Sequence, residues 1–170
     1  MEPEIRRATL LSSLKKASEP IIARNFAEQF DVSRQVIVGD IALLRAEGQE
    51  ILSTPKGYVM RSSSLKRQER RIVCQHTFEQ TLEELYLIVD HGGEIIDVIV
   101  EHPIYGELVG GLSISNRVEA NEFVQKIKNN KTSLLAELTG GLHSHTISAK
   151  DQLTLDRIVE ELKEKNLIYY

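Results

Sequence analysis

The chain has 170 residues, 41% hydrophobic and 27% charged, with a net charge of −4, and this is the composition of an ordinary soluble protein with one domain or two small ones. No apolar run approaches the roughly 20 residues that span a bilayer, and the N-terminus lacks the layout of a secretory signal. The one cysteine, Cys74, has no partner for an internal disulfide, so we expect a protein of the reducing cytoplasm. Cys74 itself is expected to be a buried strand residue.

The net charge is unevenly distributed along the chain. Residues 1–65 carry nine Lys or Arg and eight Asp or Glu, whereas residues 66–170 carry twelve and seventeen. A protein with this charge would bind DNA through a local cationic face and not through a general excess of positive charge. We therefore place any DNA binding in the N-terminal part, and a metal, a small ligand or self-association in the acidic remainder.

Three helices and a hairpin are predicted in the first sixty residues. Apolar periodicity and turn residues place helices over 4–16, 22–30 and 34–47 and strands over 50–54 and 58–60. Ser33 or Asp31 is the expected cap of the third helix, and Gly48 ends it. This order predicts a winged helix-turn-helix domain over residues 1–61.

The third helix has one face suited to DNA. Arg and Gln side chains early on a recognition helix match guanine and adenine edges, and small apolar side chains match thymine methyl groups. The predicted DNA-binding residues are Ser33, Arg34, Gln35, Val38, Ala42 and Arg45 and, at the tip of the wing, Lys56. Further cations are candidates for phosphate contacts, namely Arg6, Arg7, Lys15, Lys16, Arg24 and Arg61. The alternative is a winged helix used for protein contacts.

A second domain is predicted over residues 67–170, after a polar linker at 61–66. Alternating patterns place strands over 69–75, 94–101, 107–113 and 142–146 and helices over 79–90, 117–129 and 151–166, with an apolar stretch at 133–138 and an edge strand at 167–170. Ser115 is the expected cap of the second of these helices. The pattern indicates a two-layer α+β sandwich, with helices over one face of a mostly antiparallel sheet.

The segment 141–146, Gly-Leu-His-Ser-His-Thr, is the strongest functional signal in the chain. Alternate side chains of a strand lie on the same face, so His143 and His145 project side by side. Neutral histidine is the commonest metal ligand, and two such rings suit a divalent ion. The alternative is that one ring is solvated and the other packs in the core.

A third histidine and a carboxylate are within reach of this pair. His76 follows the first strand of the second domain, and Glu84 lies in the next helix, which can turn back toward it. Glu79 and Glu83 are alternatives that the spacing cannot separate from Glu84. Three nitrogens and one carboxylate suit a transition metal such as nickel, zinc, cobalt, iron or manganese.

The order of these motifs resembles the nicotinate-responsive repressors of NAD biosynthesis and niacin uptake, which carry a C-terminal three-histidine (3H) domain. The resemblance runs from about Arg7 to Tyr170. Its most specific parts are 98–106, Val-Ile-Val-Glu-His-Pro-Ile-Tyr-Gly, and the histidine segment 141–146. In the first half, the segment 32–45 resembles a helix-turn-helix of the biotin-repressor type.

The resemblance implies a metal, an effector and an assembly. It implies that one divalent metal is bound by His76, Glu84, His143 and His145. It also implies that nicotinic acid is the co-repressor, that the chain is a homodimer and that the second domain has an HPr-like fold. In the turn of the matching motif, His102 and Tyr105 could offer a hydrogen bond and a ring face to nicotinate.

We therefore expect a repressor that binds operator double-stranded DNA at genes of NAD biosynthesis or niacin transport, with no membrane partner and no enzymatic activity. The first alternative is a metalloregulator in which the metal is itself the signal. The second is a metal-dependent enzyme with a DNA-binding appendage. The sequence disfavours the enzyme, because the chain offers no convincing nucleophile–base pair and no glycine loop that cradles phosphate.

Overall fold

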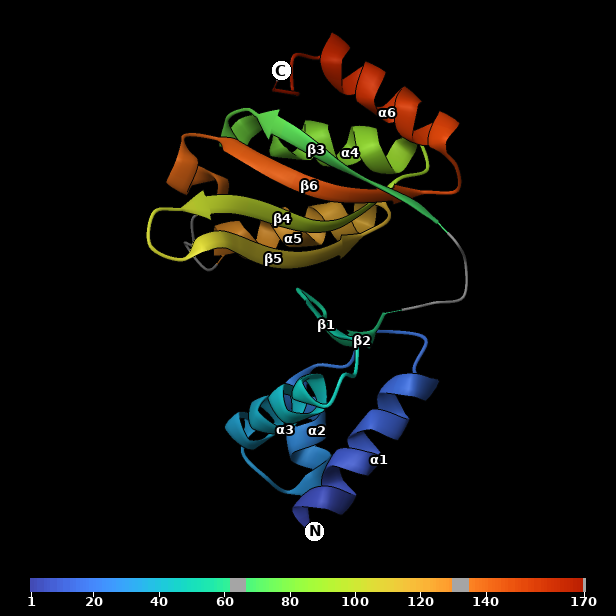
Figure 1. Cartoon of the computed structure of the whole chain (residues 1–170), viewed down its shortest axis with the longest axis vertical. Coiled ribbons are helices and arrows are strands. Elements are labelled where there is room, and N and C mark those ends of the chain that lie inside the picture. The colour runs from blue at the N-terminus through green and yellow to red at the C-terminus, as the bar shows by residue number, and fades with distance from the viewer. Residues whose placement is uncertain (62–66, 130–134, 170) are drawn as a thin grey trace. The chain divides into compact units, whose positions relative to one another are not determined.

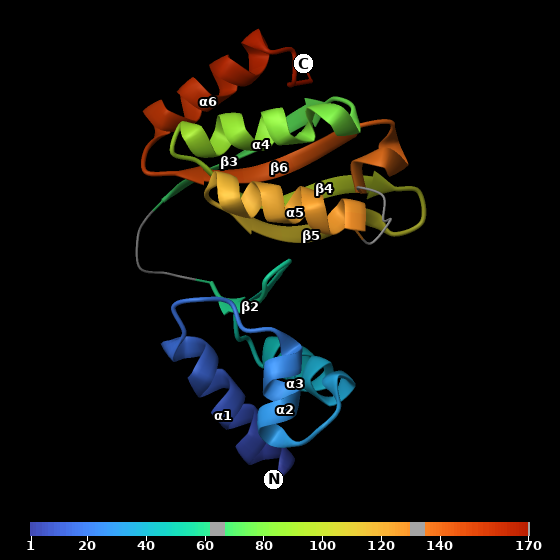
Figure 2. The ribbon, with the colours of Figure 1, turned by 180° about the vertical axis from the view of Figure 1, so that it is seen from behind.

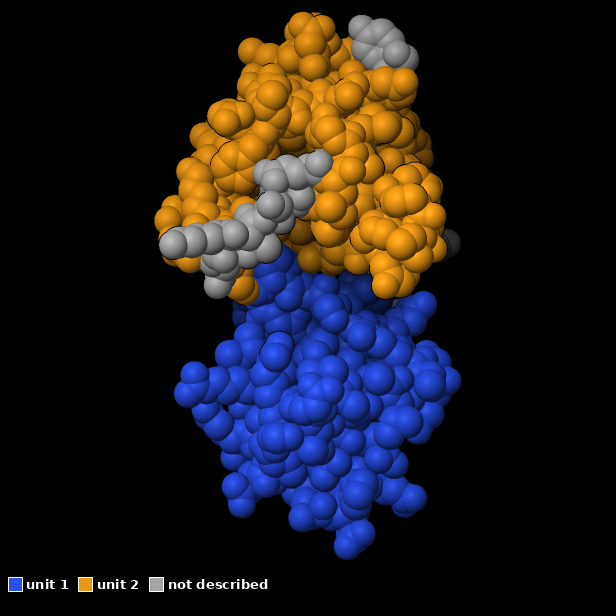
Figure 3. All heavy atoms as spheres, turned by 90° about the vertical axis from the view of Figure 1, so that its left-hand side faces the viewer, with its two compact units in different colours: residues 1–64 blue, residues 65–170 orange. Residues whose placement is uncertain are grey.

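The computed structural model describes residues 1–61, 67–129 and 135–169. It divides into two compact units, residues 1–64 and 65–170 (Figure 3). Each unit has its own hydrophobic core. None of the helices in the described ranges is long and apolar enough to cross a membrane.

Unit 1 is a winged helix-turn-helix, as predicted. Its elements are α1 (Pro3–Lys16), α2 (Ala23–Phe30), α3 (Arg34–Ala46), β1 (Ile51–Thr54) and β2 (Gly57–Met60). Ser33 caps α3, because its Oγ accepts a hydrogen bond from the Val36 amide at 3.3 Å. Ile21 exchanges two backbone hydrogen bonds with Tyr58 and so forms an isolated β-bridge to β2 of the wing.

Unit 2 is the predicted α+β sandwich. Its elements are β3 (Gln68–Gln75), a 3₁₀ turn η1 (Phe78–Gln80), α4 (Thr81–Asp90), β4 (Glu94–His102), β5 (Gly106–Ile114), α5 (Arg117–Asn129), a second 3₁₀ turn η2 (Leu135–Thr139), β6 (Leu142–Ala149) and α6 (Gln152–Glu164). The strands form one antiparallel sheet in the order β3-β6-β4-β5. Helices α4, α5 and α6 cover one face of this sheet (Figures 1 and 2).

The strand order matters for function because β6 lies between β3 and β4, although it follows both in the chain. The last strand therefore runs alongside the first one. The end of β3 is also paired on its outer edge, where the Gln75 amide donates to the Leu167 carbonyl at 3.1 Å and the Tyr169 amide donates to Val73 at 2.8 Å. The edge strand expected at 167–170 is therefore reduced to an isolated β-bridge between Cys74 and Ile168, and Tyr170 lies outside the described residues.

The apolar stretch before the histidine strand forms the 3₁₀ turn η2 from Leu135, and residues 133 and 134 lie outside the described part of the chain. One local prediction needs correction. Helix α5 is capped by Asn116 and not by Ser115. The Asn116 Oδ1 accepts from the Glu119 amide at 2.9 Å, while the Ser115 hydroxyl donates to the Glu119 carboxylate at 2.7 Å. Asn116 immediately precedes the first helical residue, so its side chain reaches the free amide three residues on.

Candidate functional site

Strand β6 carries both histidines of the motif on its core-facing side. His143, His145 and Ile147 are buried, and the residues between them face the other way. In the register with β3, Cys74 lies opposite His143 and Ile72 lies opposite His145. The period of two that predicted the same-face pair therefore holds, and both rings lie under the helices.

The end of β3 brings His76 to this pair. The chain can pass closely here because residue 141 is a glycine: a Cβ at this position would lie 2.3 Å from the His76 carbonyl oxygen, and Gly141 has a φ of 91°. Both conditions exclude an ordinary side chain. Beyond His76, Thr77 and Gln80 form a capping box that turns the chain into η1 and α4.

Glu84, in the first turn of α4, is the carboxylate that meets the histidines. Its side chain is 1% exposed, whereas Glu79 and Glu83 are exposed to solvent. The Nε2 of His145 lies 2.9 Å from Glu84 Oε1, and the Nε2 of His143 lies 3.2 Å and 3.3 Å from the two carboxylate oxygens. The Nε2 of His76 contacts Glu84 Oε2. Folding thus distinguishes Glu84 from the two neighbours that the spacing left open.

The opposite nitrogen of each ring is bound to a backbone carbonyl. The Nδ1 of His76 lies 2.9 Å from the Thr77 oxygen, that of His143 lies 2.9 Å from the Gly141 oxygen, and that of His145 lies 2.7 Å from the Asp97 oxygen. A carbonyl oxygen only accepts hydrogen bonds, so each Nδ1 carries a hydrogen. In a neutral imidazole the Nε2 atom then presents a lone pair.

Three lone pairs and a carboxylate, all acceptors, therefore converge on one buried point. Acceptors cannot hydrogen-bond to one another, so protons or a cation must lie between them. This is also the arrangement of metal-binding histidines, whose second nitrogen usually donates to a carbonyl or carboxylate. Imidazole nitrogens and a carboxylate fit a borderline transition metal.

The protein groups of the site favour one another's charged forms in spite of burial. Burial opposes ionisation of Glu84, but the three imidazoles around it hold the pKa of its carboxyl well below the usual value. Burial likewise opposes protonation of His76 and His145, and the Glu84 carboxylate outweighs it, so the pKa values of both rings are raised. Without a metal, protons on these rings balance the carboxylate.

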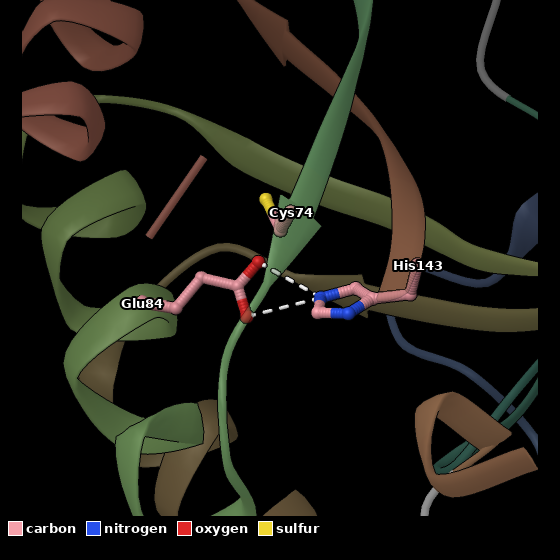
Figure 4. A group of neighbouring side chains, drawn as sticks. All are labelled: Cys74, Glu84 and His143. Carbon is pink, nitrogen blue, oxygen red and sulfur yellow. Dashed lines mark hydrogen bonds and ion pairs between the residues drawn. The ribbon is translucent and has the colours of Figure 1, made fainter. Parts of the chain in front are cut away.

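Cys74 is a further member of this cluster. It is fully buried, as expected, and the ligand atoms of Cys74, Glu84 and His143 lie within 4.8 Å of one another (Figure 4). Burial and the nearby carboxylate raise the pKa of its thiol, so in the metal-free site Cys74 is a neutral thiol. From the sequence, Cys74 was expected only as a buried strand residue. The alternation of β3 could have found it, because Cys74 and His76 are two positions apart.

An open cleft of about 440 Å³ adjoins the cluster. It is lined by Gln75, His76, Thr77, Phe78, Gln80, Gly140 and Gly141. The two residues proposed from sequence for ligand binding, His102 and Tyr105, do not line it. His102 Nδ1 accepts from the amides of Ile104 and Tyr105 at 3.1 Å and 3.3 Å, and the Tyr105 side chain is 74% exposed in the β4–β5 turn.

Most predicted DNA-binding side chains of α3 are accessible. Arg34, Gln35 and Ala42 are exposed and Val38 is partly buried, while Ile37 and Ile41 are buried beneath them. Ser33 is exposed as the helix cap, and Lys56 lies in the turn of the wing. Helix α3 therefore exposes to solvent a face with both polar and small apolar side chains, and its opposite face packs in the core of unit 1.

Several of the predicted cations have contacts within the protein, among them Arg45 and Arg6. The Arg45 guanidinium donates to the Ile51 carbonyl at 2.8 Å and to the Ser53 hydroxyl at 2.7 Å, so it fastens α3 to the wing. Arg6, expected among the phosphate-binding cations, is instead buried. Its guanidinium binds the buried carboxylate of Asp40 on α3 at 2.6 Å and 3.1 Å, and this pair joins α1 to α3.

Comparison with known proteins places both units in one family. Residues 69–170 match the model of the 3H domain, and residues 6–59 match that of a helix-turn-helix domain. The chain is 42% identical over 163 residues to the probable transcription repressor NiaR of Thermotoga maritima, covering 96% of this chain and 93% of the relative. It is 39% identical over 166 residues to the transcription repressor NadR of Bacillus subtilis, covering 96% and 92%.

Both relatives are named for a regulatory role that is not enzymatic, in agreement with the expectation from the sequence. Their similarity extends across both units and is not confined to the common helix-turn-helix. The chain belongs to the family of transcription repressors in which an N-terminal helix-turn-helix domain precedes a C-terminal 3H domain.

Proposed function

We propose that this protein is a cytoplasmic transcription repressor that binds operator DNA with residues 1–61 and senses nicotinic acid with residues 67–170, which hold one divalent transition metal. Its regulated genes are those of NAD biosynthesis or niacin transport. The proposal is supported by the kinship with repressors along nearly the whole chain. Its strongest structural support is the convergence of three histidine Nε2 atoms on Glu84.

The metal is held by His76, Glu84, His143 and His145. Nickel, zinc, cobalt, iron and manganese all accept imidazole and carboxylate ligands. When bound, the ion supplies a concentrated positive charge beside which a small anion binds favourably. This chain's own contribution is orientation, since the carbonyls of Thr77, Gly141 and Asp97 hold each ring with Nε2 toward the ion.

The DNA-binding surface is the exposed face of α3 with the wing. Arg34 and Gln35 contact base edges, Val38 and Ala42 contact thymine methyl groups, and Lys56 contacts phosphate. Ser33 orients the first turn of α3 as its cap. Arg45 acts at the base of the wing through its contacts to Ile51 and Ser53.

Nicotinic acid as the effector follows from the likeness to nicotinate-responsive repressors. Its carboxylate is attracted by the metal, and an amide lacks this anionic contact, so nicotinamide binds far more weakly. Two copies of the chain form a homodimer, and the effector sets the spacing of the two winged helices on half-sites about one or more helical turns apart. By linkage, operator DNA then tightens nicotinate binding by the factor with which nicotinate tightens DNA binding.

One experiment tests sensing and DNA binding together. The operator is first selected from a random duplex library with the full-length, metal-loaded protein. Affinity for that operator is then measured with and without nicotinate, before and after chelation. We expect nicotinate to tighten binding only when metal is present. If metal alone switches operator binding, the metal is the signal and the chain is a metalloregulator. If nicotinate tightens operator binding equally in metal-loaded and metal-stripped protein, the metal is purely structural.

A further inference from the structure

Helix α3 has an interior glycine that the fold of unit 1 does not require. Gly39 is exposed, and its backbone is helical, with no positive φ. A Cβ built at this position would meet no atom within 4 Å outside the backbone of the helix. Glycine is, after proline, the least favourable residue in a helix interior. Neither backbone conformation nor packing within the chain therefore accounts for the missing side chain.

Gly39 lies at the centre of the exposed face of α3. Residues three and four positions apart are neighbours on a helix surface. The neighbours of Gly39 are thus Gln35, Val36, Ala42 and Leu43, and all four are exposed. The helix backbone is therefore accessible at position 39, with longer side chains before and after it along the helix.

Two of these neighbours are apolar side chains with large exposed fractions. Val36 is 36% exposed and Leu43 is 50% exposed. Val38, which was expected from the sequence to contact DNA, is partly buried. On a recognition helix, exposed apolar side chains fit the C5 methyl groups of thymine, which protrude into the major groove. Val36 and Leu43 are therefore better placed for this contact than Val38.

The exposed face of α3 carries no negative charge. Asp40, next to Gly39, is the only acidic residue of α3, and its side chain is 4% exposed. The guanidinium of Arg6 binds this carboxylate from α1 at 2.6 Å and 3.1 Å. The one acidic group of the helix is thus directed inward and neutralised, so the surface around Gly39 does not repel the DNA polyanion.

We propose that Gly39 is the point at which α3 approaches the operator base pairs most closely, and that Val36 and Leu43 contact thymine methyl groups on either side of it. A residue without a Cβ lets another molecule approach the helix backbone directly. A helix-destabilising residue is then kept because DNA occupies the space of its side chain. This inference rests on the DNA-binding part of the proposed function and adds Val36, Gly39 and Leu43 to the base-reading residues.

The first test adds a side chain at Gly39 in the full-length, metal-loaded protein. Gly39→Ala and Gly39→Leu both favour the helix, and the free protein has room for a Cβ there, so we expect unit 1 to melt a few degrees higher. Affinity for the selected operator should fall by about tenfold or more, as for the loss of one matched base pair, and further for leucine than for alanine. Affinity of Gly39→Ala for random-sequence duplex should stay within about twofold, because phosphate contacts dominate that binding.

The control is Ala8→Leu, which adds an exposed leucine to a helix of unit 1 outside α3. It should leave operator affinity unchanged. Unchanged operator affinity in Gly39→Leu would overturn the inference alone, provided that the parent protein prefers the operator to random duplex. Unchanged DNA affinity with a changed oligomeric state would assign this face to protein contacts and would also overturn it. If the parent protein shows no such preference, sequence-specific binding fails, and the inference fails with it.

The second test removes methyl groups from the DNA and leaves the protein fold untouched. Uracil in place of a single thymine keeps the base pair but lacks the C5 methyl group. At the contacted positions, this replacement should weaken binding by the parent protein by about threefold to fivefold, as expected for one buried methyl group. The same replacement should have little further effect on Val36→Ala or Leu43→Ala, because the contact is already lost. Fully additive losses in both variants would show that other side chains contact these methyl groups, contrary to the proposal.

Discussion

Both compact units bury charged side chains, but they balance these charges in different ways. In unit 1, Arg6 and Asp40 form a two-bonded ion pair in which donors meet acceptors. In unit 2, the acceptor atoms of three histidines face the acceptor atoms of Glu84. The first cluster is complete within the chain, whereas the second requires protons or a cation. Buried polar groups that lack hydrogen-bond partners in this way indicate a binding site. Buried polar groups that are fully hydrogen-bonded within the chain indicate a structural role.

The largest expected effect is on metal binding and on the stability of unit 2. Glu84→Gln, or the double change His143→Ala and His145→Ala, removes ligands directly. Even supporting partners of metal ligands contribute about 10- to 100-fold to affinity, so we expect a loss above 100-fold and a clear fall in melting temperature of the metal-loaded form. Elemental analysis and thermal melting measure both.

The control for this change is Glu83→Gln. Glu83 adjoins Glu84 on the same helix but is exposed. It should retain about one metal per chain and an unchanged melting temperature. Full metal retention in the double histidine variant would contradict the assigned ligand set.

A second prediction disrupts the complete pair of unit 1. Asp40→Asn leaves the buried Arg6 guanidinium without its counter-charge, and this costs more than removing both partners. We expect unit 1 to melt several degrees lower, with no change in metal content. The double change Arg6→Met and Asp40→Leu should recover much of the loss, because neither charge is then buried alone.

The exposed pair of Arg24 and Glu28 on α2 is the control in unit 1. Their side chains are 78% and 64% exposed, and Arg24 Nε lies 2.8 Å from Glu28 Oε1. Exposed pairs contribute little to stability, so Glu28→Gln should melt almost as the parent protein does. A loss as large as that of Asp40→Asn would show that burial is not what distinguishes the two pairs.

The third prediction separates base reading from phosphate binding in unit 1. Arg34→Ala should weaken operator binding by about 1–3 kcal/mol and relax the preference at one base position. Lys56→Ala should weaken binding to all sequences and reduce the slope of log affinity against log salt by about 0.9. Competition binding with single-base operator variants and a salt series measure these effects. An unchanged operator preference in Arg34→Ala would refute the assigned recognition face.

The smallest effect is the pH dependence of unit 2. In metal-free protein the pKa values of His76 and His145 are raised on folding, so protonation of these two rings stabilises the folded state. This stabilisation is complete below about pH 6.5 and is lost as the pH rises through the raised pKa values. The lowered pKa of Glu84 contributes stability that persists until the pH falls far below about 4.3. Metal-free protein should therefore lose stability from neutral to alkaline pH.

Metal-loaded protein should show the opposite trend, because protons compete with the ion for the imidazoles and lose that competition as the pH rises. Denaturant midpoints of both forms across a pH series test the difference. Parallel curves for the two forms would mean that the ion does not occupy the histidine cluster.

Local patterns in the sequence predicted the elements well. The period of two in β6 placed His143 and His145 on one face, and the period of three to four in α3 separated buried Ile37 and Ile41 from exposed Arg34 and Gln35. The cap at Asn116 was missed, because neighbouring Ser and Asn residues both satisfy the pattern and only the start of the helix distinguishes them.

Contacts between distant segments could not be obtained in this way. Arg6 and Asp40 are 34 positions apart, and His143 and Glu84 are 59 positions apart. Each pair meets only because helices and strands pack in a particular order. The charge pattern placed Arg6 among the cations that bind phosphate, because such a pattern does not reveal which cations the fold pairs internally.

The sequence by itself determined most helices and strands of both domains. It also determined that His143 and His145 lie on one face of their strand, because backbone geometry fixes side-chain direction within a helix or a strand. The residue types alone indicated the class of ligand. Tertiary structure decided that Glu84 rather than Glu79 or Glu83 meets the imidazoles, and that carbonyls orient all three rings. The physical reason is the insertion of β6 between β3 and β4, which depends on the packing of the whole sheet and leaves no local pattern in the chain.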